Sequence, residues 1–149
     1  FVARTERRFD VILVDSTDPH GPGSVLFTEA FYRGLQRCLR PGGVVVTQNG
    51  VPFMQKREFQ GALGRLSRVF RHAGAYVVAV PTYFGGHMAL GFSHDADPAA
   101  LQPDIATLAQ RSGGLQTRYW TPEVHRAAFA LPRFIADALA EAKAGAAEG

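Results

Sequence analysis

Two aspartates, Asp15 and Asp18, stand where an apolar segment gives way to turn-forming residues. Open α/β sheets bind their ligands just beyond the ends of such segments when these are strands. Two carboxylates so close in sequence repel each other, so a site that uses both would favour a cationic ligand. The alternative is purely structural, with Asp15 capping a turn and Asp18 beginning the next one. An Asp-x-x-Asp-Pro segment on its own leaves both interpretations open.

The apolar segment before the aspartates is expected to be a strand. Residues 9–15 form a short run rich in β-branched side chains, which is typical of strands buried on both faces of a parallel sheet. The same pattern predicts a strand over residues 44–48. Two more strands are expected at residues 76–80 and 87–92, and their spacing indicates an antiparallel hairpin with a long loop.

Helices are expected between these strands. One follows Thr28, which is a suitable N-cap, and should end at Pro41-Gly42-Gly43. A second is predicted over residues 58–73, with Gly74 as its C-cap. Farther along, residues 103–111 and 122–143 are expected to be helical, and the longer of the two should break near Pro132 because proline lacks the N–H that a helix interior needs.

This order of elements predicts the α/β class, and more narrowly the second half of an open sheet. Such folds hold nucleotides through a glycine-rich turn after their first strand. The segment Gly21-Pro22-Gly23 lacks the third glycine of that turn and follows a different strand position. The chain does not begin with Met, and we expect it to be part of a longer protein.

Composition narrows the range of partners. The net charge is +3, but no basic run is interleaved with aromatic residues, so a nucleic-acid surface is not expected. No apolar run approaches the roughly 20 residues that cross a bilayer, so no membrane partner is expected. The single cysteine, Cys38, cannot form an internal disulfide and is expected in the core of a cytoplasmic protein. The five histidines have no spacing that suggests a metal site.

The aspartate segment is part of a longer pattern that resembles the signature of the polyamine aminopropyltransferase family, and within it the bacterial spermidine synthases. The matching segments follow one another in order and cover nearly all of the chain. They are Asp15-Ser16-Thr17-Asp18-Pro19 with Gly21-Pro22, Leu26-Phe27 and Phe31-Tyr32; Arg40-Pro41-Gly42-Gly43 with Thr47-Gln48-Asn49-Gly50; Pro81-Thr82-Tyr83 with Gly85-Gly86; and Tyr119-Trp120 with His125-Arg126-Ala127-Ala128-Phe129.

The resemblance implies a Rossmann-like sheet of the class I methyltransferase type, of which residues 1–149 are the C-terminal part, with an antiparallel hairpin at the end. The N-terminal β domain, the glycine-rich nucleoside loop and an Asp-Gly adenine motif would lie upstream. The implied reaction transfers the aminopropyl group of decarboxylated S-adenosylmethionine, a co-substrate, to putrescine. No permanently bound cofactor is implied, and the complete enzyme is expected to be a homodimer or homotetramer.

The resemblance also implies roles for individual residues. Asp15 would be the proton acceptor that contacts the attacking amine. The segment Asp15, Ser16, Thr17 and Asp18 would line the diamine site, with Asp18 holding an ammonium group. Gln48 and Tyr83 would lie at the same site, and Pro22 would belong to the loop that touches the nucleoside thioether.

Two departures from the family pattern bear on these roles. Gly50 stands where many members carry Glu, and Ser24 stands where Glu is common in the Gly-Pro-x-Glu loop. The alternatives left open are a related S-adenosylmethionine-type transferase, such as a spermine synthase or a methyltransferase, and a non-catalytic piece. The isolated chain is expected to be inactive.

Overall fold

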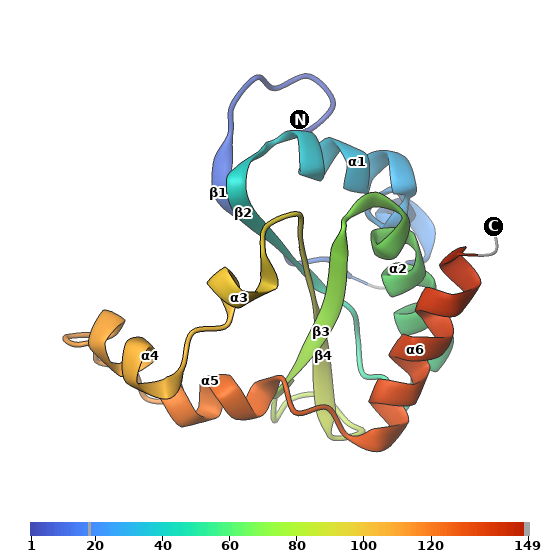
Figure 1. Cartoon of the computed structure of the whole chain (residues 1–149). Helices are drawn as coiled ribbons and strands as arrows, with labels where there is room; N and C mark the ends of the chain where they lie inside the picture. Colours follow the sequence, from blue (N-terminus) through green and yellow to red (C-terminus); the bar gives the residue numbers. More distant parts are fainter. Residues whose placement is uncertain (18, 148–149) are drawn as a thin grey trace.

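The computed structural model describes residues 1–17 and 19–147. Four strands form one mixed sheet with the spatial order β1-β2-β4-β3. β1 and β2 are parallel, and β4 is antiparallel to both of its neighbours. The predicted α/β class and the C-terminal hairpin are therefore confirmed (Figure 1). The strands are β1 (Phe9–Val14), β2 (Leu39–Gln48), β3 (His72–Ala79) and β4 (His87–His94).

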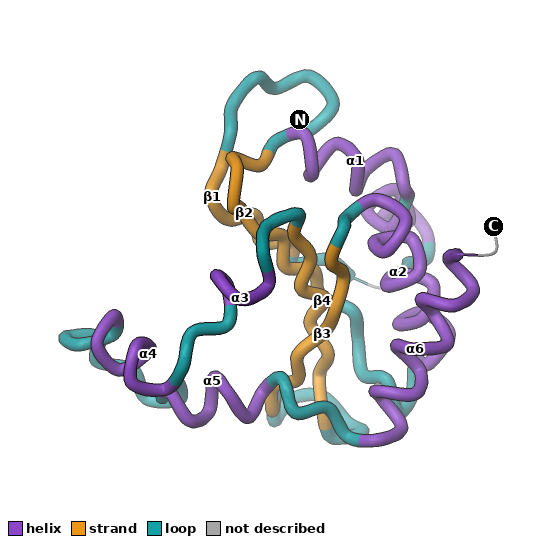
Figure 2. Tube along the Cα trace, in the orientation of Figure 1, coloured by secondary structure: helices purple, strands orange, loops and turns teal. Residues whose placement is uncertain are grey.

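Helices connect and cover the strands, as Figure 2 shows. α2 and α6 lie side by side and, together with α1, pack on one face of the sheet. That face supplies the core, in which Tyr32, Phe59, Leu63 and Ile135 are fully buried. The helical segments are the 3₁₀ helix η1 (Gly21–Phe27), α1 (Glu29–Arg37), α2 (Lys56–Val69), α3 (Pro98–Leu101), α4 (Ile105–Arg111), α5 (Pro122–Ala128) and α6 (Arg133–Ala147).

Two local predictions about helix ends are confirmed. The Thr28 hydroxyl accepts a hydrogen bond from the N–H of Phe31, as an N-cap should. The helical pattern around Pro132 is broken as expected, since α5 ends at Ala128 and α6 begins at Arg133.

The predicted end of the first helix was wrong. α1 stops at Arg37, and Pro41-Gly42-Gly43 lies inside β2. Phe9 pairs with Leu39 but Val11 pairs with Val44, so the extra residues of β2 are taken up in an irregular stretch of the ladder. A Cβ at Gly43 would lie 3.0 Å from the carbonyl oxygens of both Arg40 and Asp10, so glycine permits this close approach of the two strands.

The predicted end of the second helix was wrong as well. α2 ends at Val69, and Gly74 is an interior residue of β3 rather than a C-cap. Phe70 already has an extended backbone, and the carboxylate of Asp95 accepts a hydrogen bond of 2.7 Å from the N–H of Arg71. Pairing with β4 from His72 onward therefore replaces the last predicted turn of helix.

The sheet has two chemically different ends. β4 is antiparallel both to β2 and to β3, so β3 runs in the same direction as β1 and β2. The carboxyl ends of all three strands consequently lie at one end of the sheet, where they lead into the loops after Val14, Gln48 and Ala79. Within the described residues, no helix is long and apolar enough to cross a membrane.

Candidate active site

Asp15 is the first residue beyond the β1 ladder. Val14 pairs with Thr47, so the next residues of the two strands, Asp15 and Gln48, are neighbours at the carboxyl end of the sheet. Asp15 is exposed and Ser16 is buried, as expected for successive residues of an extended segment that point to opposite sides. The structure therefore presents the Asp15 carboxylate to a ligand that approaches this end of the sheet.

A narrow crevice lies just beyond Asp15, between the loop after β1 and the loop after β2. Thr17, Gln48, Asn49 and Glu58 are among the residues that line it. Its volume is about 10 Å³, roughly the space that one water molecule needs, so a diamine does not fit into it in this conformation. The predicted ammonium anchor, Asp18, lies outside the described residues.

Asn49 organises the end of β2 and was not singled out from the sequence. Its Oδ1 accepts hydrogen bonds from the Thr47 hydroxyl at 2.6 Å and from the N–H of Gly91 at 3.0 Å. Its Nδ2 is buried and has no hydrogen-bond partner among the described residues, which places an unsatisfied donor beside the crevice. The sequence signal was the segment Gln48-Asn49-Gly50 itself, but no spacing rule shows that its middle residue faces inward.

Gly50 gives a physical reason for the departure from the family pattern noted above. Its φ is +74°, a left-handed conformation that side chains other than glycine rarely adopt. A Cβ there would collide with the side chain of Gln55, whose Oε1 accepts a hydrogen bond of 3.0 Å from the N–H of Val51. The loop as folded therefore needs glycine at position 50, and a glutamate would require another loop conformation.

Tyr83 lies in the β3–β4 loop, at the same end of the sheet as Asp15 and Gln48. The side chain is 52% exposed. A Cβ at Gly85 would lie 2.9 Å from the side chains of Val51 and Met54, so this loop packs against the loop that follows β2. Tyr83 therefore lies at the carboxyl end of the sheet, as predicted. No described contact joins it to Asp15.

Pro22 belongs to η1, the segment between β1 and α1. The side chain is exposed at the start of this 3₁₀ helix, and the buried Phe27 anchors the other end of η1 in the core. His20 Nε2 lies 3.9 Å from Glu58 Oε1, so the loop before η1 lies near the first turn of α2. Pro22 is accessible from outside.

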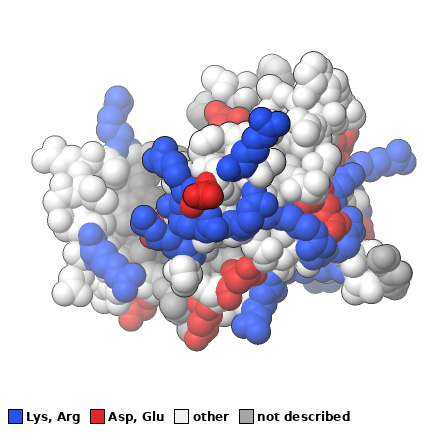
Figure 3. All heavy atoms as spheres, turned by 90° about the horizontal axis from the view of Figure 1, so that it is seen from above, with Lys and Arg blue, Asp and Glu red and all other residues white. Residues whose placement is uncertain are grey.

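Charge is distributed unevenly between the two ends of the sheet. Asp15 and Glu58 lie at the carboxyl end, whereas the last turns of α1 and α2 carry Arg37 and Arg68 to the opposite end. Figure 3, which faces that opposite end, shows a band of Lys and Arg side chains across it. The start of α2 also carries Lys56, which pairs with Glu141, and Arg57, so the negative charge at the carboxyl end is local to Asp15 and Glu58. Among the described residues, no group of three or more His, Cys, Asp or Glu could hold a metal ion.

The chain is similar to known proteins over most of its length. The family model for the spermine/spermidine synthase domain matches residues 1–101. Polyamine aminopropyltransferases of Shigella sonnei and Serratia proteamaculans are each 48% identical over 141 residues, which is 94% and 93% of this chain and 49% of each relative. The chain thus spans about half the length of these curated relatives.

Two solved structures extend the likeness to the fold. One is a spermidine synthase in complex with the transition state analogue AdoDATO, with 35% identity and a TM-score of 0.82 over 93% of this chain and 47% of that one. The other is spermidine synthase from Thermotoga maritima, with 34% identity and a TM-score of 0.79 over 93% of this chain and 46% of that one. The chain has the class I methyltransferase-like fold of these enzymes, and with the matched domain this shows that it belongs to the spermine/spermidine synthase family.

Proposed function

We propose that the protein containing this chain is a spermidine synthase, which transfers the aminopropyl group of decarboxylated S-adenosylmethionine to putrescine and releases spermidine and methylthioadenosine. The observation that carries the proposal is the position of Asp15, an exposed carboxylate at the carboxyl end of β1 beside Gln48, in a chain similar to a spermidine synthase solved with a transition state analogue. That end of the sheet suits a cationic acceptor.

The charges of the reactants define what Asp15 has to do. Putrescine is a dication near neutral pH, and an ammonium group has no lone pair with which to attack carbon. Proton transfer from an ammonium group of pKa about 10.4 to the carboxylate of an acid of pKa about 3.9 would cost roughly 9 kcal/mol. Asp15 therefore does not act as a strong base. The positive sulfonium of the donor lowers the pKa of the nearby amine, and Asp15 orients the neutral amine.

The transfer itself balances without a further reactant. The amine lone pair forms the new C–N bond, the C–S bond breaks, and its electron pair neutralises the sulfonium. The proton released from the amine passes to Asp15, directly or through water. In-line positioning of nitrogen, carbon and sulfur contributes much of the remaining rate.

The other predicted residues complete the proposed site. Ser16, Thr17 and Gln48 line the diamine beside Asp15, and Asp18 holds the ammonium group that stays charged. Tyr83 closes the far end of the diamine site from the β3–β4 loop. Pro22, exposed on η1, contacts the nucleoside thioether. Because the Ser16 side chain is buried, we expect its backbone rather than its hydroxyl to face the diamine.

The crevice beside Gln48 is too small for a diamine, so the chain alone is not expected to catalyse the reaction. We propose that the upstream half found in full-length relatives supplies the nucleoside loop and opens the substrate site. The complete enzyme is proposed to act in the cytoplasm as a homodimer or homotetramer.

The test is Asp15→Asn in the complete enzyme, which keeps the shape but removes the charge and the proton acceptor. We expect kcat for spermidine formation to fall by about 10²–10⁴. Asp10→Asn is the matched control, because Asp10 is an exposed carboxylate at the other end of the same strand, where it pairs with Arg40 at 2.7 Å. Near-normal turnover by Asp15→Asn would overturn the mechanism.

Parallel assays separate the related activities. Spermidine formation from putrescine is compared with spermine formation from spermidine, and with methyl transfer from S-adenosylmethionine. A faster reaction with either alternative substrate would replace the proposed function by that activity.

A further inference from the structure

A second cavity lies at the opposite end of the sheet from Asp15. It has a volume of about 540 Å³ and follows the outer edge of β3. His72 pairs with His94, and His94 pairs with Val44 of β2, whereas Gln48 pairs with Leu90. The cavity beside His94 and the crevice beside Gln48 are therefore four strand residues, or about 13 Å, apart along the sheet. No described residue lines both this cavity and the crevice beside Gln48.

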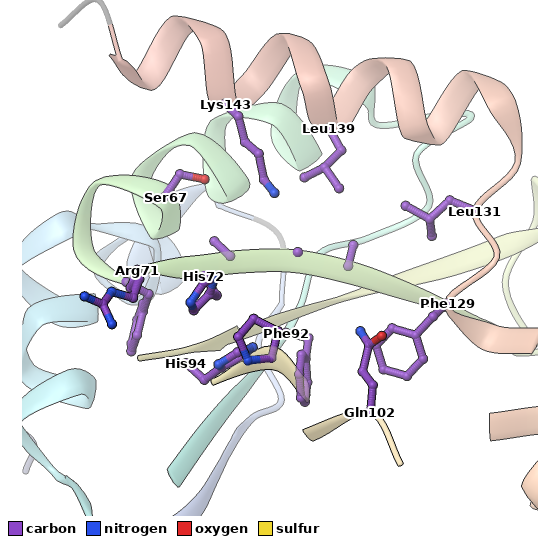
Figure 4. A pocket seen from close by; sticks show the side chains of 15 residues that line it. Ser67, Arg71, His72, Phe92, His94, Gln102, Phe129, Leu131, Leu139 and Lys143 are labelled. Carbon is purple, nitrogen blue, oxygen red and sulfur yellow. The ribbon is translucent and has the colours of Figure 1, made fainter. Parts of the chain in front are cut away.

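One end of the cavity is lined by basic side chains and by no acidic ones among the described residues. Arg71, His72, His94 and Lys143 line it. Figure 4 shows Lys143 reaching from α6 toward β3, with His72 and His94 on the other side of that strand. Among the described residues, no carboxylate forms an ion pair with Arg71 or Lys143. The Arg71 side chain turns away from the other labelled side chains, so Lys143 is the charge that reaches into the cavity.

The backbone of β3 adds donors of its own. The N–H of Ala79 points away from β4 and donates to the hydroxyl of Tyr119. Ala89 of β4, which pairs with Val77, forms its backbone hydrogen bonds with Asn49 and Gly50 on the β2 side, so the N–H of Val77 also points away from β4. Peptide groups alternate in direction along a strand. The N–H groups of Ala73 and Ala75 consequently also point to the outer edge of β3, where the cavity lies.

His94 is the buried member of the histidine pair. Its Nδ1 lies 3.1 Å from the carbonyl oxygen of Ala96 and therefore carries the proton, and its ring stacks on that of His72 with centroids 5.0 Å apart. Burial and the neighbouring His72 lower the pKa of His94. Asp95, next in the chain, instead accepts hydrogen bonds from Gln36 and from the Arg71 backbone, and it lines a different cavity.

The other end of the cavity is apolar. Phe92, Phe129, Leu131 and Leu139 line it, and the rings of Phe92 and Phe129 meet edge to face with centroids 5.7 Å apart. Figure 4 shows Phe129 and Leu131 at the end away from Arg71. A cavity of this size is much larger than an inorganic anion and falls within the usual range for small organic ligands.

We propose that this cavity binds a small organic anion, with a phosphate or carboxylate head at the outer edge of β3, where Lys143, the N–H groups of Ala73 and Ala75 and the paired histidines lie, and a flat apolar body against Phe92 and Phe129. The proposal is independent of the aminopropyl transfer, since no residue of the candidate active site takes part in it.

Calorimetric titration of the complete enzyme with phenyl phosphate is the direct test. Three comparison ligands are titrated in the same way. Inorganic phosphate has only the anionic head, phenol has only the aromatic ring, and benzylamine has an aromatic ring with a cationic head. We expect phenyl phosphate to bind with a Kd about tenfold or more below that of each of the other three, because it uses both ends of the cavity. Absence of binding, or equal binding of phenyl phosphate and benzylamine, would overturn the proposal.

Matched variants locate the binding. Lys143→Gln should weaken phenyl phosphate binding about tenfold, the usual scale for one charged hydrogen bond. Lys143→Arg should retain most of the affinity because it keeps the charge. Arg118→Gln removes one charge from an exposed loop residue outside the cavity and should leave the affinity unchanged. An equal loss in Arg118→Gln would show that binding reflects net charge alone.

A spectroscopic readout follows from His94. Binding of the anion should favour the protonated imidazole, so the NMR titration midpoint of the His94 ring should move to higher pH when phenyl phosphate saturates the cavity. The midpoint of the exposed His87 should stay where it is. Identical midpoints for His94 with and without phenyl phosphate would place the ligand elsewhere.

Discussion

Asp15 and Ser16 show how the position of a residue along an extended segment decides whether its side chain can reach a ligand. Both lie in the same short segment, but the extended backbone exposes the carboxylate and buries the hydroxyl. Asn49 is the counterpart on β2. Its buried oxygen accepts hydrogen bonds from the Thr47 hydroxyl and from the N–H of Gly91, which joins the end of β2 that carries Gln48 to β4.

The lowered pKa of His94 predicts a pH dependence of folding stability. The unfolded chain binds a proton on this histidine at a higher pH than the folded chain does. The free energy of unfolding should therefore be largest above the unfolded pKa of about 6.5 and should fall as the pH is lowered from there. Urea unfolding of the chain between neutral and mildly acidic pH measures this slope.

His94→Gln should flatten the slope of stability against pH, because it removes the group that titrates. His87→Gln is the control, since His87 is an exposed histidine on the same strand. An unchanged slope in His94→Gln would mean that another group takes up the proton.

At the scale of elements, the loops at the carboxyl end of the sheet depend on special backbone conformations. The loop after β2 turns at Gly50 with φ +74°, and Gln55 folds back to accept from the N–H of Val51. The loop after β3 lies against the same segment through Gly85. Each loop therefore supports the other, and both depend on where β2 ends.

Gly50→Ala is expected to destabilise the chain by about 1 kcal/mol or more, because alanine is strained at positive φ and its methyl group meets Gln55. Thermal unfolding compares it with Gly145→Ala. Gly145 lies in α6 with nothing within 4 Å of an added Cβ, so alanine there should raise the free energy of unfolding by about 0.5–1 kcal/mol. Equal effects of the two changes would contradict the assigned loop conformation.

At the scale of the whole molecule, β1 is an edge strand with apolar side chains in solvent. Val11 is 54% exposed and Leu13 is 71% exposed. An uncovered apolar strand edge promotes association. The full-length relatives are about twice as long as this chain, and we propose that their additional half covers this edge.

The isolated chain should therefore self-associate, and Leu13→Lys should shift it toward the monomer. Leu115→Lys is the matched control, because Leu115 is 67% exposed but lies in a loop far along the chain from β1. Sedimentation velocity over a range of concentrations measures the effect. A monomeric wild-type chain, or an equal effect of both lysines, would contradict the role assigned to the β1 edge.

The sequence alone determined those features that follow from local rules. Short apolar runs predicted the four strands and their spacing predicted the hairpin, while Thr28 predicted a helix start and Pro132 a break, because each depends on a few neighbouring residues. The motif around Asp15 also predicted the family, which the matched domain confirms.

Tertiary structure decided the rest, because it depends on partners distant in the chain. Gly74 became a strand residue since β4 pairs with it, and Pro41-Gly42-Gly43 joined β2 since β1 lies beside it. The inward position of Asn49 depends on Gly91. The cavity at the edge of β3 forms because α6 places Lys143 beside that edge, and no short stretch of sequence predicts this contact between distant segments.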